Sequence, residues 1–283
     1  MKFANLLISL VVGVALSCAA TVRGETADEA FARGNTLLAN GDLQKALQAY
    51  STAVRAQRNN QQYSQQFMLV RRAVALRQSL GRETDPKRWQ RTARALRAFY
   101  ISQGLYREAL PVDEKIHARL NTASSAVQLA ETQLAVGNNA AAARVLATLG
   151  PKGSTAATQA MLAVALARQG RMADARKIAG TTSPPKKAGP GTLYSLARMH
   201  AIVGHQEQAL ALLIRSFEAV PPSRLDNLKT HAKQSPEFAA LASTAGFAQA
   251  LRAKSKVAES KCSGGSSCAG CPMRGKCSKS HGS

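Results

Sequence analysis

Aromatic side chains are scarce in this chain: of 283 residues one is Trp, 5 are Tyr and 7 are Phe. Strands are enriched in aromatic and β-branched residues that alternate with polar ones, and no segment shows that alternation. The 45% of apolar residues comes mainly from alanine and leucine, which favour helices. The composition therefore predicts an all-α protein.

Signatures of catalysis are also absent. No HExxH or nucleophile-elbow motif occurs in the sequence. Residues 150–155 share the composition of a phosphate loop, but their order and spacing are wrong, and a connection between helices explains them. We interpret the histidines outside the C-terminal tail as packing or surface residues, because none has a ligand partner nearby: His117, His200, His205 and His231. We expect no enzymatic activity.

Acidic residues are few. The chain has 38 Lys and Arg against 16 Asp and Glu, a formal net charge of +22. Removing residues 1–24 would take away only Lys2 and Arg23 and leave +20. Much of the excess lies between residues 55 and 97, where Glu83 and Asp85 are the only acidic side chains. Such a balance favours an anionic partner.

Five glycines recur at a regular interval. Gly104, Gly137, Gly170 and Gly204 are 33, 33 and 34 residues apart, and Gly41 precedes Gly104 by 63, close to two such intervals. Each ends an apolar helical pattern about five residues before an alanine. A period of ~34 residues is typical of stacked helical hairpins, which bury their apolar faces only between neighbours. The sequence predicts antiparallel helix pairs over residues 26–220, with a turn at each glycine.

Small and large side chains follow one arrangement around each glycine. The first copy is Ala30, Gly34, Leu37, Gly41, Ala46, Tyr50 and Ala53. The later copies are Ala93, Leu96, Tyr100, Gly104, Ala109; Ala126, Leu129, Ala130, Gly137, Ala142, Leu146; Leu162, Ala163, Leu166, Gly170, Ala175; and Leu193, Leu196, Ala197, Gly204, Ala209, Leu213. This arrangement resembles the tetratricopeptide repeat, although the family's tryptophan position holds Ala or Leu in most copies. The resemblance implies a right-handed helical-hairpin solenoid with a concave surface for binding proteins.

One copy lacks this signature. Its apolar residues, within 67–80, have helical spacing, but no glycine divides them into a hairpin. We expect either an unbroken helix over 62–80 or a degenerate repeat at 58–85, ended by Gly81 and Pro86.

Beyond Pro221 and Pro222 the apolar pattern becomes shorter. Ser235 is a favourable N-cap, and Pro236 suits the first position of a helix. We expect a C-terminal helical cap, completing a TPR-like α-solenoid over residues 25–258, with three apolar side chains covering the open end of the stack: Phe238, Leu241 and Phe247.

The amino terminus has the layout of a secretory signal peptide. Lys2 is followed by an apolar run over 3–16 and then by small residues, so residues 1–24 predict export, with cleavage near residue 20 or 24. The run is shorter than the ~20 residues that a membrane-spanning helix needs. Residues 15–18 partly resemble a bacterial lipoprotein box, which leaves anchoring through Cys18 as an alternative. We expect a periplasmic or extracellular protein.

The densest basic segment predicts a binding surface. On a helix, Lys87, Arg91 and Arg94 lie on one face, at positions i, i+4 and i+7. The resemblance implies that this face of the first helix of a hairpin lines the groove. We expect it to bind a protein partner with acidic segments, or an anionic envelope surface; a solvated helix face is the alternative. Nucleic acid is disfavoured, since no recognition motif or aromatic stacking set accompanies the arginines.

A second candidate binding residue is Asn35. Some members of the family hold a peptide's terminal carboxylate with a lysine and an asparagine one turn apart. Asn35 matches the asparagine, and Phe31 stands at the place of the lysine. The sequence thus supports half of that clamp.

The segment 259–283 has a different composition. Lys, Ser and Gly replace the apolar periodicity, so we expect a flexible basic tail. It holds Cys262, Cys268, Cys271 and Cys277, which favour two disulfides in an exported protein. A four-thiolate zinc or iron site, built around the CxxC of Cys268 and Cys271, is the alternative. The tail also resembles short cysteine-rich tails of small bacterial proteins associated with iron uptake.

These features predict an exported scaffold that mediates protein–protein interaction in bacterial envelope assembly or complex organisation. The alternatives are a metal-handling protein that uses the tail, and a polyanion-binding protein that uses its basic surface.

Overall fold

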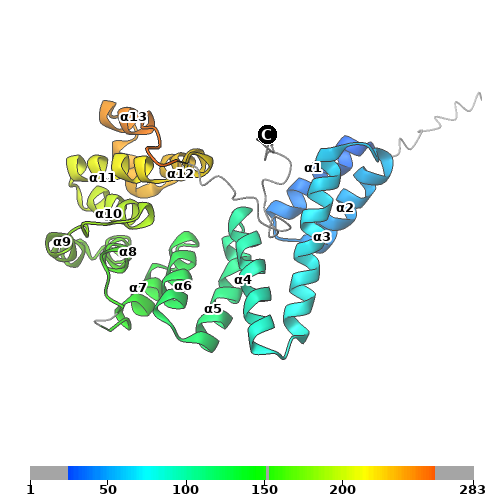
Figure 1. Ribbon diagram of the computed structural model, residues 1–283, viewed down its shortest axis with the longest axis horizontal. Helices are drawn as coiled ribbons and strands as arrows, with labels where there is room; N and C mark the ends of the chain where they lie inside the picture. The colour runs from blue at the N-terminus through cyan, green and yellow to red at the C-terminus, as the bar shows by residue number, and fades with distance from the viewer. Residues whose placement is uncertain (1–24, 151–152, 259–283) are drawn as a thin grey trace, which may run out of the picture. The chain divides into compact units, whose positions relative to one another are not determined.

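The computed structural model describes residues 25–150 and 153–258. Within these ranges the chain forms thirteen α-helices and one 3-10 helix, and no strand (Figure 1). Most helices pack against the next helix in the sequence or against the adjacent hairpin, so the all-α helical-hairpin solenoid is confirmed. The chain separates into two compact units, the first ending at Gln78 and the second beginning at Ser79.

The first unit is built on a tight hairpin. It comprises α1 (Ala27–Ala39), α2 (Leu43–Ala56) and most of α3 (Gln61–Arg82). Gly34 lets the two helices of the hairpin approach, because an added Cβ would lie 2.6 Å from the Tyr50 ring. Tyr63 of α3 packs against alanines of α1 and α2, and its hydroxyl donates to Asp28.

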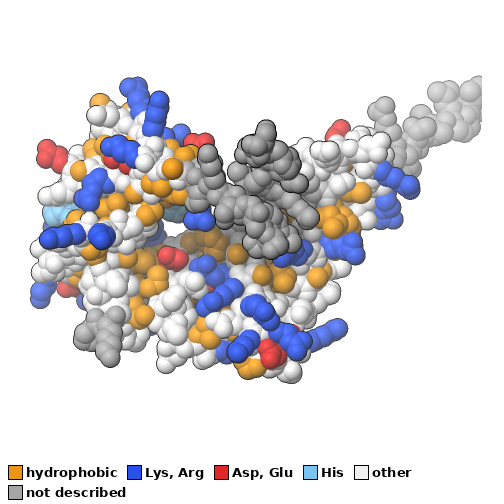
Figure 2. Space-filling view, in the orientation of Figure 1, with side chains coloured by type: hydrophobic (Ala, Val, Ile, Leu, Met, Phe, Trp, Pro, Cys, Tyr) orange, Lys and Arg blue, Asp and Glu red, His pale blue; other side chains and the backbone are white. Residues whose placement is uncertain are grey.

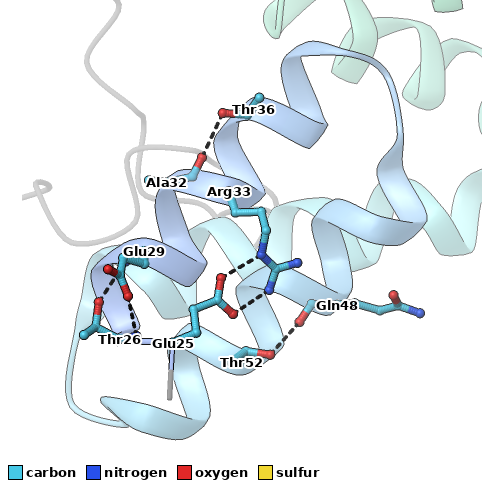
Figure 3. Close-up of polar contacts among 8 residues, drawn as sticks. All are labelled: Glu25, Thr26, Glu29, Ala32, Arg33, Thr36, Gln48 and Thr52. Atoms are coloured by element: carbon cyan, nitrogen blue, oxygen red, sulfur yellow. Dashed lines mark hydrogen bonds and ion pairs between the residues drawn. The ribbon is translucent and has the colours of Figure 1, made fainter. Parts of the chain in front are cut away.

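Local hydrogen bonds define where α1 begins (Figure 3). The Thr26 hydroxyl accepts from the Glu29 backbone at 3.3 Å, and the Glu29 carboxylate accepts from the Thr26 backbone at 2.8 Å. This capping box satisfies two N–H groups that a helix start leaves unpaired. Arg33 holds Glu25 through two hydrogen bonds of 2.7 Å.

The segment without a turn glycine is one unbroken helix, as expected for residues 62–80. α3 runs for 22 residues. Gly81 does not terminate it, since the helix continues to Arg82 and Gly81 lacks a positive φ. The next helix begins where expected, because Asp85 accepts from the Arg88 backbone and Pro86 fills the first helical position.

The second unit stacks four hairpins. Their eight helices are α4 (Pro86–Ser102), α5 (Tyr106–Leu120), α6 (Ala123–Ala135), α7 (Asn139–Ala147), α8 (Ala156–Ala167), α9 (Met172–Thr181), α10 (Pro190–Val203) and α11 (Gln206–Ala219). Besides its hairpin partner, α8 also contacts α6 and α10, the first helices of the adjacent hairpins. A continuous core of small and branched apolar side chains runs from α6 to the end of this unit.

Five turns of one type join the helices of the hairpins. The predicted glycines all have positive φ, between 70° and 93°. After each glycine, the next backbone N–H donates to the carbonyl five residues earlier, as Leu105 does to Tyr100 at 2.8 Å and His205 to His200 at 2.8 Å. This is the Schellman arrangement, which requires a left-handed residue that glycine adopts without strain. The prediction of turns at Gly41, Gly104, Gly137, Gly170 and Gly204 is confirmed.

The C-terminal cap consists of α12 (Pro222–Gln234), the 3-10 helix η1 (Pro236–Leu241) and α13 (Ala245–Leu251). Phe238, Leu241 and Phe247 are at most 3% exposed, which confirms their covering role. One detail of the sequence prediction is wrong. The Ser235 hydroxyl does not cap the helix; it donates to the Glu237 carboxylate at 2.5 Å.

No helix in the described ranges has the length and apolar character that crossing a membrane requires.

Candidate functional site

The turn glycines define equivalent positions in the hairpins. Two residues that precede their glycines by the same number of positions occupy the same face of their helices. Arg94 and Tyr194 each stand ten residues before a turn glycine, on α4 and α10. Glu131 and Arg198 each stand six residues before one, on α6 and α10. This equivalence lets the surfaces of successive hairpins be compared.

The predicted basic face lies on α4. Lys87, Arg91 and Arg94 are exposed, and their side chains have no ion pair or hydrogen bond with a described residue. The opposite face of α4 is buried, with Trp89 3% and Leu96 1% exposed. Blue side chains gather over the part of the molecule where Figure 1 places α4 and α5 (Figure 2). α4 therefore presents uncompensated positive charge to solvent.

Another cation of the same helix, Arg97, has a different role. Arg97 is mostly buried, and its Nε donates to Asp113 of α5 at 2.6 Å. The second oxygen of Asp113 accepts from the Thr132 hydroxyl of α6 at 2.6 Å. Burial raises the pKa of Asp113, and the hydrogen bond from Thr132 and the charge of Arg97 oppose that rise. Arg97 belongs to the interior, although its position in a basic run gave no sign of this.

Repeat equivalence would have indicated this pair. Arg97 precedes its turn glycine by seven residues and Asp113 follows by nine, the positions that Gly34 and Tyr50 hold in the first hairpin. A charged residue at each of two positions that face one another inside a hairpin predicts an ion pair. From the sequence, Arg97 was placed only at the end of the basic segment 55–97, and Asp113 was not identified.

A surface pocket of the second unit lies next to the ion pair of Arg97 and Asp113. This pocket, of about 460 Å³, is lined by α4, α6 and the start of α8, including Arg97, Ser124, Gln128, Glu131 and Thr155. Ser124, Gln128 and Glu131 share one face of α6. The Glu131 side chain is 56% exposed and lies 3.7 Å from Arg97.

Two further arginines of the second unit hold a carboxylate of the cap. Arg168, directly after α8, lies 2.5 Å from Glu237, and Arg198 of α10 makes two hydrogen bonds of 3.2 Å to it. Burial alone would raise the pKa of Glu237, but the charge and hydrogen bonds of Arg198, the Ser235 hydroxyl and Arg168 outweigh it and lower that pKa to about 2. Glu237 is thus an ionised carboxylate between two guanidinium groups, 3% exposed.

Tyr194, one turn before Arg198 on α10, makes aromatic contacts beside Glu237. The Tyr194 ring of α10 lies edge-on to Phe238, with ring centroids 5.9 Å apart. Its hydroxyl is 2.6 Å from Nδ1 of His231. Burial raises the pKa of Tyr194 and lowers that of His231. Tyr194, Arg198 and Arg168 together form the surface against which residues 235–241 are held.

Asn35 lies on α1, in the first unit. It is exposed, and its Oδ1 accepts from the Tyr50 hydroxyl at 2.8 Å. Phe31, at the place of the family's lysine, stacks on Tyr63 with ring centroids 4.6 Å apart. Packing and an internal hydrogen bond therefore occupy both residues of the predicted half-clamp. Partner binding by Asn35 stays a prediction.

The cysteines predicted to form disulfides, bind a metal or anchor the chain are not among the described residues. Cys18, Cys262, Cys268, Cys271 and Cys277 are outside the described residues, as is the predicted signal peptide. Within 25–150 and 153–258, no three or more Cys, His, Asp or Glu side chains group as metal ligands.

The histidines of the second unit contact described residues. His117 Nδ1 is 3.1 Å from the Ser125 hydroxyl, and His231 meets Tyr194. His200 and His205 face one another with their Nδ1 atoms 3.2 Å apart.

No protein-family model matches this chain, and the comparison with curated proteins finds no match.

Proposed function

We propose that this protein is a non-catalytic scaffold, built from TPR-like hairpins, that binds acidic segments of partner proteins outside the cytoplasm. The observation that carries the proposal is the face of Lys87, Arg91 and Arg94 on α4, which is exposed and without an acidic partner in the described chain. Ionic contacts at such a surface raise the rate of encounter with an acidic partner.

Repeat equivalence supports a binding role for this face. Arg94 occupies the position that Tyr194 holds on α10, and Tyr194 contacts residues of the cap. The face of α10 that holds a segment of polypeptide corresponds to the face of α4 that carries the cations. A partner segment on α4 would use the same side of a hairpin.

Charge reversal tests the proposal. In Arg91→Glu/Arg94→Glu, binding of a fluorescein-labelled octaglutamate peptide should weaken by at least tenfold and should fall with added salt. The matched control is Arg176→Glu/Lys177→Glu on α9, which removes the same charge from two exposed positions on the second helix of another hairpin. Equal affinity in both variants would show that net charge alone attracts the peptide, as in the polyanion-binding alternative.

The partner class needs a second measurement. Mature protein immobilised on resin should capture acidic proteins from an envelope extract, and the Arg91→Glu/Arg94→Glu variant should lose them while the α9 control keeps them. Export is tested by fractionating cells and sequencing the amino terminus of the mature chain, where cleavage near residue 20 or 24 is expected.

The four tail cysteines support metal handling as a second candidate function. Intact mass of the exported protein separates the two interpretations, because each disulfide removes two hydrogens, whereas a thiolate site loses its ion to a chelator and then exposes four alkylatable thiols.

A further inference from the structure

Residues 235–241, with the sequence SPEFAAL, pack onto α10 in the way a bound peptide would. η1 contacts α10 directly. Its interactions come from side chains at short intervals: the Glu237 carboxylate meets Arg168 and Arg198, and the next residue, Phe238, meets Tyr194. Leu241 follows one turn later and is 1% exposed. The segment thus presents an acidic anchor followed by two apolar anchors.

The receiving surface belongs to the stacked hairpins. Arg168 is the C-cap residue of α8, and Tyr194 and Arg198 come from α10. Arg168 also donates to the Leu134 carbonyl at 2.8 Å, which fixes its guanidinium independently of the cap. Two guanidinium groups directed at one point form a site for a carboxylate, whose two oxygens match their planar donors.

Covering the end of a helical stack does not require an ion cluster. Replacing a buried ion pair by apolar side chains is often neutral or stabilising, so burying Glu237 between two arginines is an inefficient way to close a core. Such an arrangement disfavours a neutral side chain at the position of Glu237, because it would leave both guanidinium groups without a counter-charge.

α12, which leads into this segment, is joined to the rest of the second unit by few buried side chains and by the contact of His231 with Tyr194. Of the thirteen residues of α12, only Leu225 and Ala232 are buried. A short tether holds its ligand at an effective concentration on the order of mM, so the tethered segment outcompetes any weaker ligand supplied in solution.

We propose that Arg168, Tyr194 and Arg198 form a peptide-binding site for partner segments of the pattern Glu-Phe-x-x-Leu, occupied in this structure by the chain's own residues 235–241. This deepens the proposed function, since it rests on the same use of a hairpin face and specifies the chemistry of the partner. The α4 face selects only for charge, whereas this site requires an acidic residue directly followed by an aromatic one.

The test opens the site in the full-length chain. Glu237→Ala/Phe238→Ala/Leu241→Ala removes the three anchors of the internal segment. A fluorescein-labelled heptapeptide with the sequence of residues 235–241 is the probe, and the same peptide with Gln in place of Glu is the control. The opened chain should bind the Glu peptide at least tenfold more tightly than the Gln peptide, and adding Arg198→Gln should abolish the difference.

A folded, opened chain that binds both peptides equally, or neither, overturns the proposal. If the opened chain loses its helical signal, the milder Glu237→Gln variant decides, because it weakens only the acidic anchor of the internal segment: a heptapeptide with benzoylphenylalanine at the Phe position should photolabel α10 in that variant, and absence of label there also overturns the proposal. Exchange of the segment between two wild-type chains, seen as a stable dimer, would make a second copy the occupant and refute a separate partner. Arg176→Glu/Lys177→Glu on α9, which lies in neither proposed site, should not change the Glu-over-Gln preference; since the α4 face is tested with octaglutamate and this site with the Glu and Gln heptapeptides, the two tests can fail separately.

Discussion

The hairpins α1/α2 and α4/α5 share a turn and differ in what fills the space between their helices. In the first, Gly34 accommodates the ring of the fully buried Tyr50. In the second, the equivalent positions hold Arg97 and Asp113, joined at 2.6 Å. The backbone arrangement depends on the glycine turn, and the interior tolerates either an apolar contact or an ion pair. The residue that forms the turn and the residues that pack between the two helices therefore vary independently. Substitutions can test the contribution of each to stability.

The largest effect is expected from breaking the ion pair. Asp113→Ala leaves the Arg97 guanidinium, 16% exposed, without its close partner, and removes the acceptor of the Thr132 hydroxyl. Unpaired buried charges destabilise by roughly 3–5 kcal/mol. Urea unfolding should show this loss. The double variant Arg97→Met/Asp113→Leu should recover most of it, because apolar pairs replace buried ion pairs with little change in stability; a double variant as unstable as Asp113→Ala would contradict this interpretation.

The apolar hairpin should respond to an added methyl group. Gly34→Ala places a Cβ 2.6 Å from the Tyr50 ring, and overpacking destabilises by roughly 1–3 kcal/mol. The higher helix propensity of alanine, about 1 kcal/mol, offsets part of this. Thermal unfolding should report a net loss. Gly81→Ala is the matched control, because Gly81 lies in the last turn of α3 with nothing within 4 Å of an added Cβ, and it should not destabilise.

Much of the fold was predictable from spacing alone. The turn glycines and the capping apolar residues were correct because each rests on a local rule: a left-handed turn needs glycine, and a periodic apolar face needs cover. Arg97, Asp113 and Glu237 were not identified, because a charged residue in a basic or polar run has the same local pattern whether it faces solvent or a partner far along the chain. Arg168 and Glu237 are brought together by stacking, which sequence spacing does not specify.

The hairpins α4/α5 and α10/α11 also differ in the residues around their turns, and this difference predicts a pH dependence of stability. His200 and His205 flank Gly204, where the α4/α5 turn has Tyr100 and Leu105. Their Nδ1 atoms are 3.2 Å apart, so one ring must accept the hydrogen bond and remain neutral there. Burial, with a smaller contribution from His205, lowers the pKa of His200. A lowered histidine pKa stabilises the fold above the unfolded value near 6.5, and this contribution is lost as pH falls through the folded pKa.

The pH prediction is tested with His200→Tyr, which removes the group whose pKa is lowered and places there the residue that the α4/α5 hairpin has at the equivalent position, Tyr100. Wild type should lose thermal stability between pH 7 and pH 5, and the variant should lose less. The contribution of Glu237, whose pKa is lowered from 4.5 to about 2, is complete above pH 4.5 and disappears as pH falls toward 2, so it lies outside this window. Parallel curves for the two proteins between pH 7 and pH 5 would exclude the histidine pair as the cause.

The smallest effect on stability is expected from charge reversal on the exposed face of α4, next to the buried ion pair of Arg97 and Asp113. Arg94 lies on the same helix as Arg97, but it is exposed and its side chain has no ion pair with a described residue. Arg91→Glu/Arg94→Glu should therefore change the unfolding free energy by less than about 0.5 kcal/mol, because exposed charges contribute little. A shift toward higher stability would also be consistent, since reversal relieves repulsion within the basic segment. A loss of 2 kcal/mol or more would mean that these side chains hold the hairpin together, and the α4 face would then be structural, as Arg97 is, and would no longer be a candidate for binding.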